Sequence, residues 1–139
     1  YGRGPLENYI DRYSSSFIGR YEDKVENQFY WYIRPQETGN KTDVRWLALL
    51  NSEGEGVKIT GLQPIAFSAL HFSPEDLDPG LTRKLQHTID IVPQKNIFLH
   101  VDLKQCGLGG DNSWGMYPYN KYRLLDKKYV YSYMIELID

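Results

Sequence analysis

Residues 107–115, Gly-Leu-Gly-Gly-Asp-Asn-Ser-Trp-Gly, combine the residue types from which a binding loop can be built. We call this segment the glycine loop. Glycine costs about 1 kcal/mol relative to alanine inside a helix or strand, so three glycines within four positions predict an irregular loop with positive φ or close backbone approach. Trp114, near the end of the loop, has a large flat apolar ring with one N–H donor. Such a ring can pack against the C–H face of a ring bound in a pocket. The loop is therefore a candidate binding site.

Purely structural interpretations of the same residues remain open. Trp is usually largely buried, so Trp114 could simply fill the core beside a tight turn. Asp111 could accept hydrogen bonds from backbone N–H groups two residues further on, as Asp often does in turns. A phosphate-binding loop is disfavoured, because that motif needs a lysine and a following helix, which Gly115 and Pro118 prevent.

Carboxylates could serve glycoside hydrolysis, which requires two acids that face one bond. Four candidates lie in segments rich in turn residues or aromatics: Glu37, Asp43, Asp102 and Asp111. Their pairing cannot be read from the sequence. Residues 34–46 mix turn residues with the start of a basic and aromatic strand, so their polar groups could gather at one end of the fold. The alternative for this segment is a solvated turn.

Metal and nucleophilic chemistry find little support. His71, His87 and His100 are too isolated for a zinc motif, and Cys106 is the single cysteine. No G-x-S-x-G motif is present, which disfavours a serine nucleophile. We therefore expect neither a metal site nor a catalytic nucleophile in this chain.

Composition restricts the possible partners. The 139 residues carry a net charge of -2 with both signs interspersed, which gives no broad basic footprint for nucleic acid or for an anionic membrane. One cysteine excludes an internal disulfide. The chain begins with Tyr1 and shows no signal-peptide pattern, so we expect a piece of a longer polypeptide. Its compartment stays open between the cytoplasm and the periplasm.

The elements that must position these residues are mostly strands. Twelve tyrosines and an aromatic content of 14% favour an all-β core. Apolar runs and turn signals predict strands at residues 44–50, 57–60, 65–72, 85–91, 97–105 and 129–137. A short helix should begin after Ser73, with Pro74 at its first position.

The strand at 97–105 alternates, with Ile97, Leu99, Val101 and Leu103 on one face, and leads directly into the glycine loop. Residues 1–40 are expected to be irregular with one helical turn, since Gly19 weakens the helical spacing there. Turn signals every eight to twelve residues predict one β-sandwich domain over residues 1–139 rather than a βαβ sheet.

Three ordered motifs together resemble a known family. They are Gly-Arg-Gly-Pro-Leu-Glu-Asn-Tyr-Ile-Asp-Arg at residues 2–12, the segment from Pro35 to Trp46, and the glycine loop preceded by Val101 and Asp102. This chain resembles the C-terminal domain of large β-galactosidases of glycoside hydrolase family 2 over nearly its whole length. The resemblance implies a galactose mutarotase-like supersandwich and an enzyme that hydrolyses terminal β-D-galactosides.

Site roles follow from the resemblance. It implies that both catalytic glutamates of a retaining mechanism lie in an absent TIM barrel, and that the Mg and Na ions often used by the family bind elsewhere. It implies that Trp114 lines the sugar pocket, and that the loop is supported by Gly107, Gly109, Gly110, Asp111, Asn112 and Ser113. Asn112 stands where some relatives carry a second Asp.

The resemblance also implies that this chain is the later half of the supersandwich. Its partners would be the galactoside, the remaining domains of the enzyme and, through exposed strand edges, a second copy. Two alternatives remain, a stand-alone carbohydrate-binding or mutarotase-like module and a purely structural domain.

Overall fold

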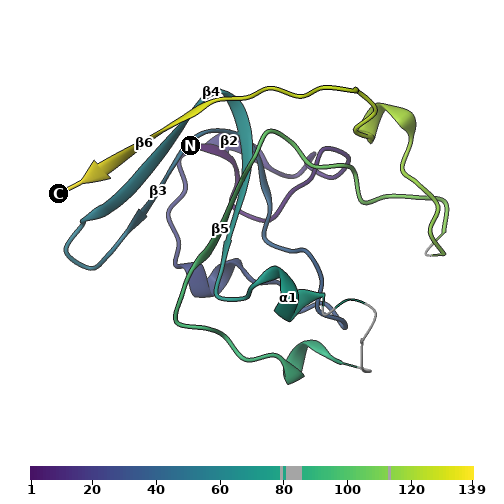
Figure 1. The fold of residues 1–139 in the computed structure, drawn as a ribbon, viewed down its shortest axis with the longest axis horizontal. Coiled ribbons are helices and arrows are strands. Elements are labelled where there is room, and N and C mark those ends of the chain that lie inside the picture. Colours follow the sequence, from purple (N-terminus) through teal and green to yellow (C-terminus); the bar gives the residue numbers. More distant parts are fainter. Residues whose placement is uncertain (79, 81–85, 113) are drawn as a thin grey trace.

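The computed structural model describes residues 1–78, 80, 86–112 and 114–139 (Figure 1). Its strands are β1 (Gly2–Gly4), β2 (Phe17–Gly19), β3 (Lys41–Leu50), β4 (Gly56–Leu70), β5 (Phe98–Asp102) and β6 (Tyr133–Ile138). The described residues also contain the α-helix α1 (Pro74–Leu77) and the 3₁₀ turns η1 (Val25–Gln28), η3 (Thr88–Asp90) and η4 (Asn120–Tyr122). Within these described ranges, no helix is long and apolar enough to cross a bilayer.

Two antiparallel sheets make up the fold. β1 pairs with β2, while β4 is the centre of a four-stranded sheet and pairs with β3, β5 and β6. Figure 1 shows β6 running beside the β3–β4 hairpin, with the glycine loop and η4 at the opposite side of the molecule. The predicted all-β class is confirmed, and the arrangement is consistent with a sandwich.

The β3–β4 hairpin confirms the strands predicted at 44–50 and 57–60 but corrects the extent of the second. Residues 57–60 and 65–72 were expected to be separate strands, because Gly61 and Pro64 usually interrupt one. Instead β4 is continuous through Leu70, and its register with β3 shifts between Trp46↔Thr60 and Val44↔Ile65. The extra β4 residues form a bulge, where proline needs no ladder hydrogen bond. Beyond this bulge β4 changes its second partner from β6 to β5.

The short helix is confirmed with its predicted cap. Ser73 Oγ accepts a hydrogen bond from the Asp76 N–H at 3.2 Å, and Asp76 Oδ2 accepts one from the Ser73 N–H at 2.8 Å. Such a capping box satisfies two N–H groups that the helix start leaves open. Pro74 then occupies the first turn.

Several predicted boundaries are wrong. The extended segment at 85–91 contains η3 instead, because Asp90 Oδ2 accepts from the His87 N–H at 2.7 Å and closes a turn; Leu85 lies outside the described residues. β5 and β6 are shorter than the strands predicted at 97–105 and 129–137. In residues 1–40 the predicted helical turn is η1, but β1 and β2 were missed.

Two apolar clusters form the core. One joins the η1 region to the end of β4 and to α1: Phe29, Leu70, Phe72, Leu77 and Ile91. The other lies in the four-stranded sheet: Val44, Leu47, Ile59 and Ile65, with Leu49, Phe67, Leu99 and Val101 packed against it. Leu99 and Val101 thus share a core-facing side, as their alternation predicts.

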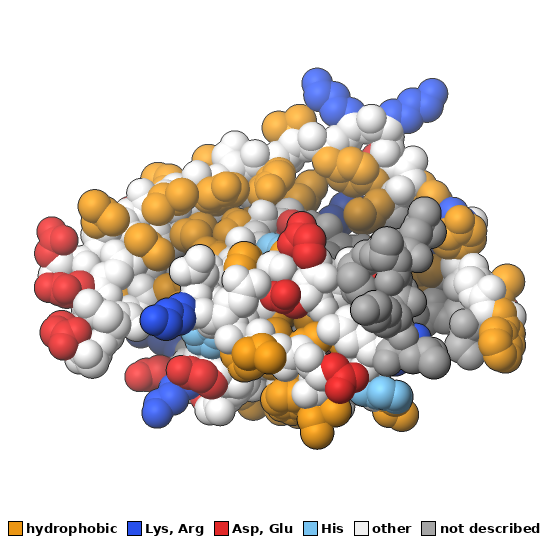
Figure 2. Space-filling view, turned by 60° about the horizontal axis from the view of Figure 1, so that its bottom comes forward, with side chains coloured by type: hydrophobic (Ala, Val, Ile, Leu, Met, Phe, Trp, Pro, Cys, Tyr) orange, Lys and Arg blue, Asp and Glu red, His pale blue; other side chains and the backbone are white. Residues whose placement is uncertain are grey.

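The sheet carries an apolar face that is buried at the centre of β3 and β4 but that the described part of the chain leaves uncovered along β6. Cross-strand partners share a face, and the register places seven apolar residues together, which we call the open face: Leu47, Leu49, Val57, Ile59, Tyr133, Ile135 and Leu137. Leu47 and Ile59 are buried, but Ile135 is 63% exposed and Leu137 is 79% exposed. Figure 2 shows hydrophobic side chains gathered over β6 and the β3–β4 hairpin.

Candidate functional site

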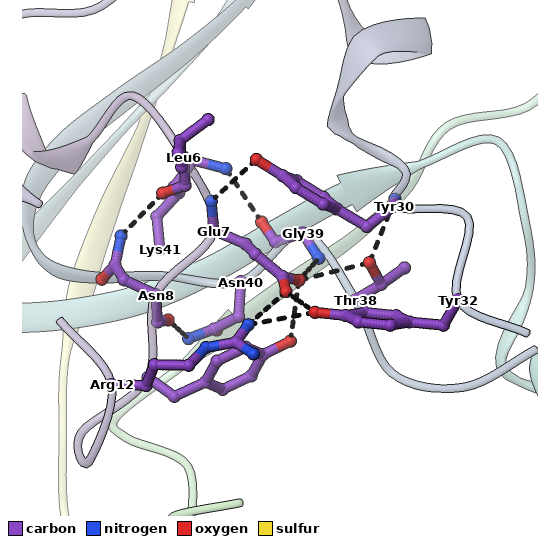
Figure 3. A network of polar contacts seen from close by, with 11 residues as sticks. Leu6, Glu7, Asn8, Arg12, Tyr30, Tyr32, Thr38, Gly39, Asn40 and Lys41 are labelled. Carbon is purple, nitrogen blue, oxygen red and sulfur yellow. Dashed lines mark hydrogen bonds and ion pairs between the residues drawn. The ribbon is translucent and has the colours of Figure 1, made fainter. Parts of the chain in front are cut away.

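A buried carboxylate organises the N-terminal motif (Figure 3). Glu7 Oε1 accepts hydrogen bonds from Arg12 Nη2 and from the Tyr32 hydroxyl. Glu7 Oε2 accepts from the Gly39 N–H at 2.9 Å, the Thr38 hydroxyl at 3.2 Å and the Tyr9 hydroxyl at 3.3 Å. Both oxygens of Glu7 are therefore engaged in holding residues 32–39 against residues 7–12.

Electrostatics support this structural role of Glu7. Burial by itself would raise the pKa of the carboxyl. The hydrogen bonds from Tyr32 and the Gly39 N–H, together with the Arg12 charge, outweigh burial and hold the pKa of Glu7 below its ordinary value. Glu7 is thus a stably ionised anchor, whereas a general acid needs a raised pKa.

Asn8 joins the same two segments. The Asn8 N–H donates to the Asn40 carbonyl at 2.8 Å, and Asn40 Nδ2 donates back to the Asn8 carbonyl at 2.9 Å. Asn8 Oδ1 accepts from the Thr42 N–H at 2.9 Å. Thr38 and Asn40 are fully buried, so the alternative of a solvated turn is wrong for these positions. Local polarity suggested exposure because the distant partners of these groups were not apparent.

The glycine loop is tied to the N-terminal motif and to η4. Asp11 Oδ2 accepts a hydrogen bond from the Gly109 N–H at 2.7 Å, and the Gly107 N–H donates to the Tyr122 carbonyl at 2.7 Å. A Cβ at Gly107 would lie 2.7 Å from Asp11 Oδ2, and one at Gly110 would lie 2.6 Å from the Met116 carbonyl oxygen. The predicted irregular loop with close approach is confirmed, and Asp11 is a supporting residue that the sequence reasoning missed.

Trp114 projects from the loop into open space. Its side chain is 89% exposed, so the alternative in which it fills the core of this chain is wrong. The backbone N–H of Trp114 donates to Asn112 Oδ1 at 2.8 Å, which fixes the main chain next to the indole. Asn112 thus makes the two-residue turn contact expected of an Asx residue. The prediction for Asp111 involves Ser113, which lies outside the described residues.

The other carboxylate candidates have separate surroundings. Asp43 forms an ion pair with Arg3, Oδ2 to Nε at 2.5 Å. Glu37 is half-buried, and burial raises its pKa; the His100 charge and a hydrogen bond from Gln105 act against that rise, while the Asp102 charge adds to it. Glu37 and Asp102 therefore lie near one another, whereas Asp43 lies apart from them in its ion pair with Arg3.

A buried lysine adjoins the Glu7 network. Lys41 Nζ donates to Gln28 Oε1 at 2.9 Å and to the Gly39 carbonyl at 3.2 Å. Burial lowers the pKa of Lys41 to about 8, although the charges of Glu7 and Asp23 favour its protonated form. No group of three or more His, Cys, Asp and Glu among the residues that the structure describes is placed to hold a metal ion.

A hollow of about 610 Å³ opens between the glycine loop and η4. Its wall includes Asp11, Gly110, Asp111, Tyr117, Tyr119 and Arg123. Both tyrosines are 71% exposed, and the Arg123 guanidinium carbon lies 4.4 Å from the centroid of the Tyr117 ring. The site residues predicted from sequence thus meet a second, aromatic segment at residues 117–123, for which the sequence predicted no role.

Comparisons with known proteins agree with the motifs. The family model described as "Beta galactosidase small chain" matches residues 1–135. The chain is 39% identical over 124 residues to a β-galactosidase of Priestia megaterium, covering 89% of this chain and 12% of that enzyme. It is 31% identical over 125 residues to one of Halalkalibacterium halodurans, covering 89% of this chain and 12% of that enzyme. A β-galactosidase of Streptococcus thermophilus is 33% identical over 138 residues, 98% of this chain and 13% of its own length. The chain therefore spans about one eighth of the length of these relatives.

Proposed function

Because the chain belongs to the β-galactosidase small chain family, we propose that it is the C-terminal domain of an enzyme that hydrolyses terminal β-D-galactosides. In this proposal the domain supplies a wall of the sugar pocket and a surface for assembly with the rest of the enzyme. The observation that carries it is the exposed Trp114 on a loop fixed from the N-terminal motif. The similar proteins are β-galactosidases of much greater length, which supports a multidomain parent.

The exposure of Trp114 supports its contact with sugar. An indole that is 89% exposed presents a flat apolar surface, and such surfaces pack against the C–H faces of sugar rings. The loop behind it is held by two hydrogen bonds, from the Gly107 N–H to the Tyr122 carbonyl and from the Gly109 N–H to the Asp11 carboxylate. Residues 107–109 then need little ordering on binding, which favours affinity.

The catalytic glutamates are proposed to lie outside this chain, in a barrel domain, together with the Mg and Na ions that the family often uses. A retaining glycosidase needs two carboxyl groups about 5 Å apart on either side of the scissile bond. Glu7 and Asp43 are each committed to arginine partners, which supports structural rather than catalytic roles for both.

The open face supports a role in assembly. Leu137 and Ile135 are among its exposed members, and apolar patches of this kind mark interaction sites. We propose that the remaining domains of the enzyme cover this face. Pairing of a free strand edge with a second copy remains a prediction; light scattering that finds only monomers of the 139-residue chain at all concentrations would contradict it.

Turnover of a chromogenic β-galactoside tests the proposal. The whole polypeptide that carries this sequence should be active, and the 139-residue chain alone should be inactive. Trp114→Ala in the whole enzyme should raise KM by about fivefold or more, since aromatic contacts contribute about 0.5–1.5 kcal/mol beyond area burial. Trp31→Ala, which alters another well-exposed indole at 65% exposure, is the matched control and should leave KM unchanged.

Two outcomes would count against this function. Appreciable turnover by the 139-residue chain would refute the placement of the catalytic acids elsewhere. An unchanged KM in Trp114→Ala would refute the sugar-lining role. Sugar binding by the 139-residue chain that requires Trp114 and is as tight as binding by the whole enzyme would instead favour the stand-alone carbohydrate-binding module, whereas weak binding is expected of a domain that supplies only one wall of the pocket.

A further inference from the structure

The hollow beside the glycine loop has walls that are fixed without any ligand. The Gly107 N–H to Tyr122 carbonyl bond joins the loop to η4, and the Tyr122 N–H donates to the Tyr119 carbonyl at 2.8 Å within η4. Asp11 anchors the loop by accepting a hydrogen bond from the Gly109 N–H. The missing Cβ of Gly110 lets the Met116 carbonyl approach and closes the loop. These contacts give the hollow a defined shape.

One of its aromatic side chains, Tyr117, is restrained as well. Arg123 lies over the Tyr117 ring, and its Nη1 donates to Asn120 Oδ1 at 3.3 Å. A cation above one ring face restrains Tyr117. Tyr117 and Tyr119 are each 71% exposed, so both retain apolar surface that water now covers.

The charges in the wall select a class of ligand. Asp11 and Asp111 disfavour an anion such as a phosphorylated compound, while Arg123 disfavours a cation. A sugar is neutral, and its hydroxyls donate to carboxylates and accept from guanidinium groups. Its C–H faces pack on tyrosine rings. A volume of about 610 Å³ lies within the range of pockets for small ligands.

We propose that this hollow is a subsite for a further sugar unit of an oligosaccharide substrate, beside the unit that Trp114 contacts. The inference rests on the proposed function, because it assumes that Trp114 faces a sugar. Only Gly115 and Met116 separate Trp114 from Tyr117 in the chain, so one oligosaccharide can reach both rings. The preferred substrates are then galactosides longer than a disaccharide.

Binding to the 139-residue chain, followed by ligand-observed NMR, tests the subsite with lactose and a β-linked galactotetraose. The tetrasaccharide should bind about fivefold more tightly than lactose, the size of one aromatic contact. Tyr117→Ala should abolish that gain and leave the lactose Kd unchanged. Trp114→Ala should weaken both ligands, and Trp31→Ala should affect neither.

The outcomes separate the two ideas. Equal Kd values for both sugars, no saturable binding of the tetrasaccharide, or a length-dependent gain that survives in both Tyr117→Ala and Tyr119→Ala would overturn the subsite. If Trp114→Ala changes neither Kd while Tyr117→Ala removes the gain, the sugar-facing role of Trp114 fails and the hollow stands. Both tyrosines are exposed, so circular dichroism of the variants should match that of the unaltered chain.

Discussion

The carboxylate of Asp11 and the N–H of Gly109 meet at 2.7 Å, 98 residues apart in the sequence. This contact makes the N-terminal motif a support for the glycine loop. Residues 2–12 therefore matter to the candidate site although Trp114 lies at the far end of the chain. Glu7 and Asn8 extend the support to residues 38–42.

Asp11→Ala should loosen the loop with little effect on the rest of the fold. A hydrogen bond to a charged group contributes about 1.5–3 kcal/mol, so amide exchange at Gly109 should accelerate by at least tenfold. Exchange in β4 should change far less. Asp11→Asn keeps an acceptor oxygen, so its exchange rate at Gly109 should lie between those of the unaltered chain and Asp11→Ala. Equal exchange rates at Gly109 in all three proteins would refute the support role.

Gly110→Ala should destabilise the chain more than Gly109→Ala. The added Cβ at Gly110 would lie 2.6 Å from a backbone oxygen of Met116, which cannot move alone. At Gly109 the nearest atom is the end of the Asp11 side chain at 3.1 Å. Overpacking of this kind costs about 1–3 kcal/mol, which urea denaturation can measure. The reverse order of stability would show that the loop packs differently.

Glu7→Gln should destabilise the chain at pH 7 by about 1–3 kcal/mol, because the buried partners lose a charged acceptor. The lowered pKa of Glu7 gives the sign: its contribution is present above the unfolded pKa of about 4.3 and is lost as pH falls through the folded value. The difference in unfolding free energy between the two proteins should therefore shrink in acid. Glu53→Gln, in the exposed hairpin turn, is the control and should show no such difference.

Glu37→Gln should act in the opposite direction and stabilise the chain at neutral pH. Burial raises the pKa of Glu37, so the folded state favours the protonated carboxyl. That favourable contribution is complete at low pH and is lost as pH rises from the unfolded pKa of about 4.3 through the folded value. A Tm that is higher in the variant at pH 7 and converges with the original near pH 4 is expected. A lower Tm of the variant at pH 7 would contradict this.

Local signals predicted some features well. Glycine density identified the loop, Ser73 and Pro74 identified α1, and alternation placed Leu99 and Val101 on one core side. In each case the cause lies within a few residues of the effect. The exposure of Trp114 agrees with its interpretation as a binding residue, but the neighbouring residues alone also left open a Trp114 that fills the core.

Contacts between distant segments were beyond local signals. Thr38 and Asn40 looked like turn residues because their partners, Glu7 and Asn8, lie about thirty positions earlier. Gly61 and Pro64 looked like strand breakers, yet they fall where β4 changes its second partner from β6 to β5. Whether such residues end a strand or form a bulge depends on the neighbouring strands, which sequence spacing does not show.

The change of partners along β4 has a consequence for the order of folding. The β3–β4 hairpin joins neighbouring segments and can form early, whereas β6 must come from the end of the chain to complete the same strand. The bond between Asp11 and Gly109 likewise waits for the last third of the chain. During synthesis Asp11 therefore leaves the ribosome long before Gly109, and the glycine loop gains its contacts with Asp11 and Tyr122 only after residue 122 has been made.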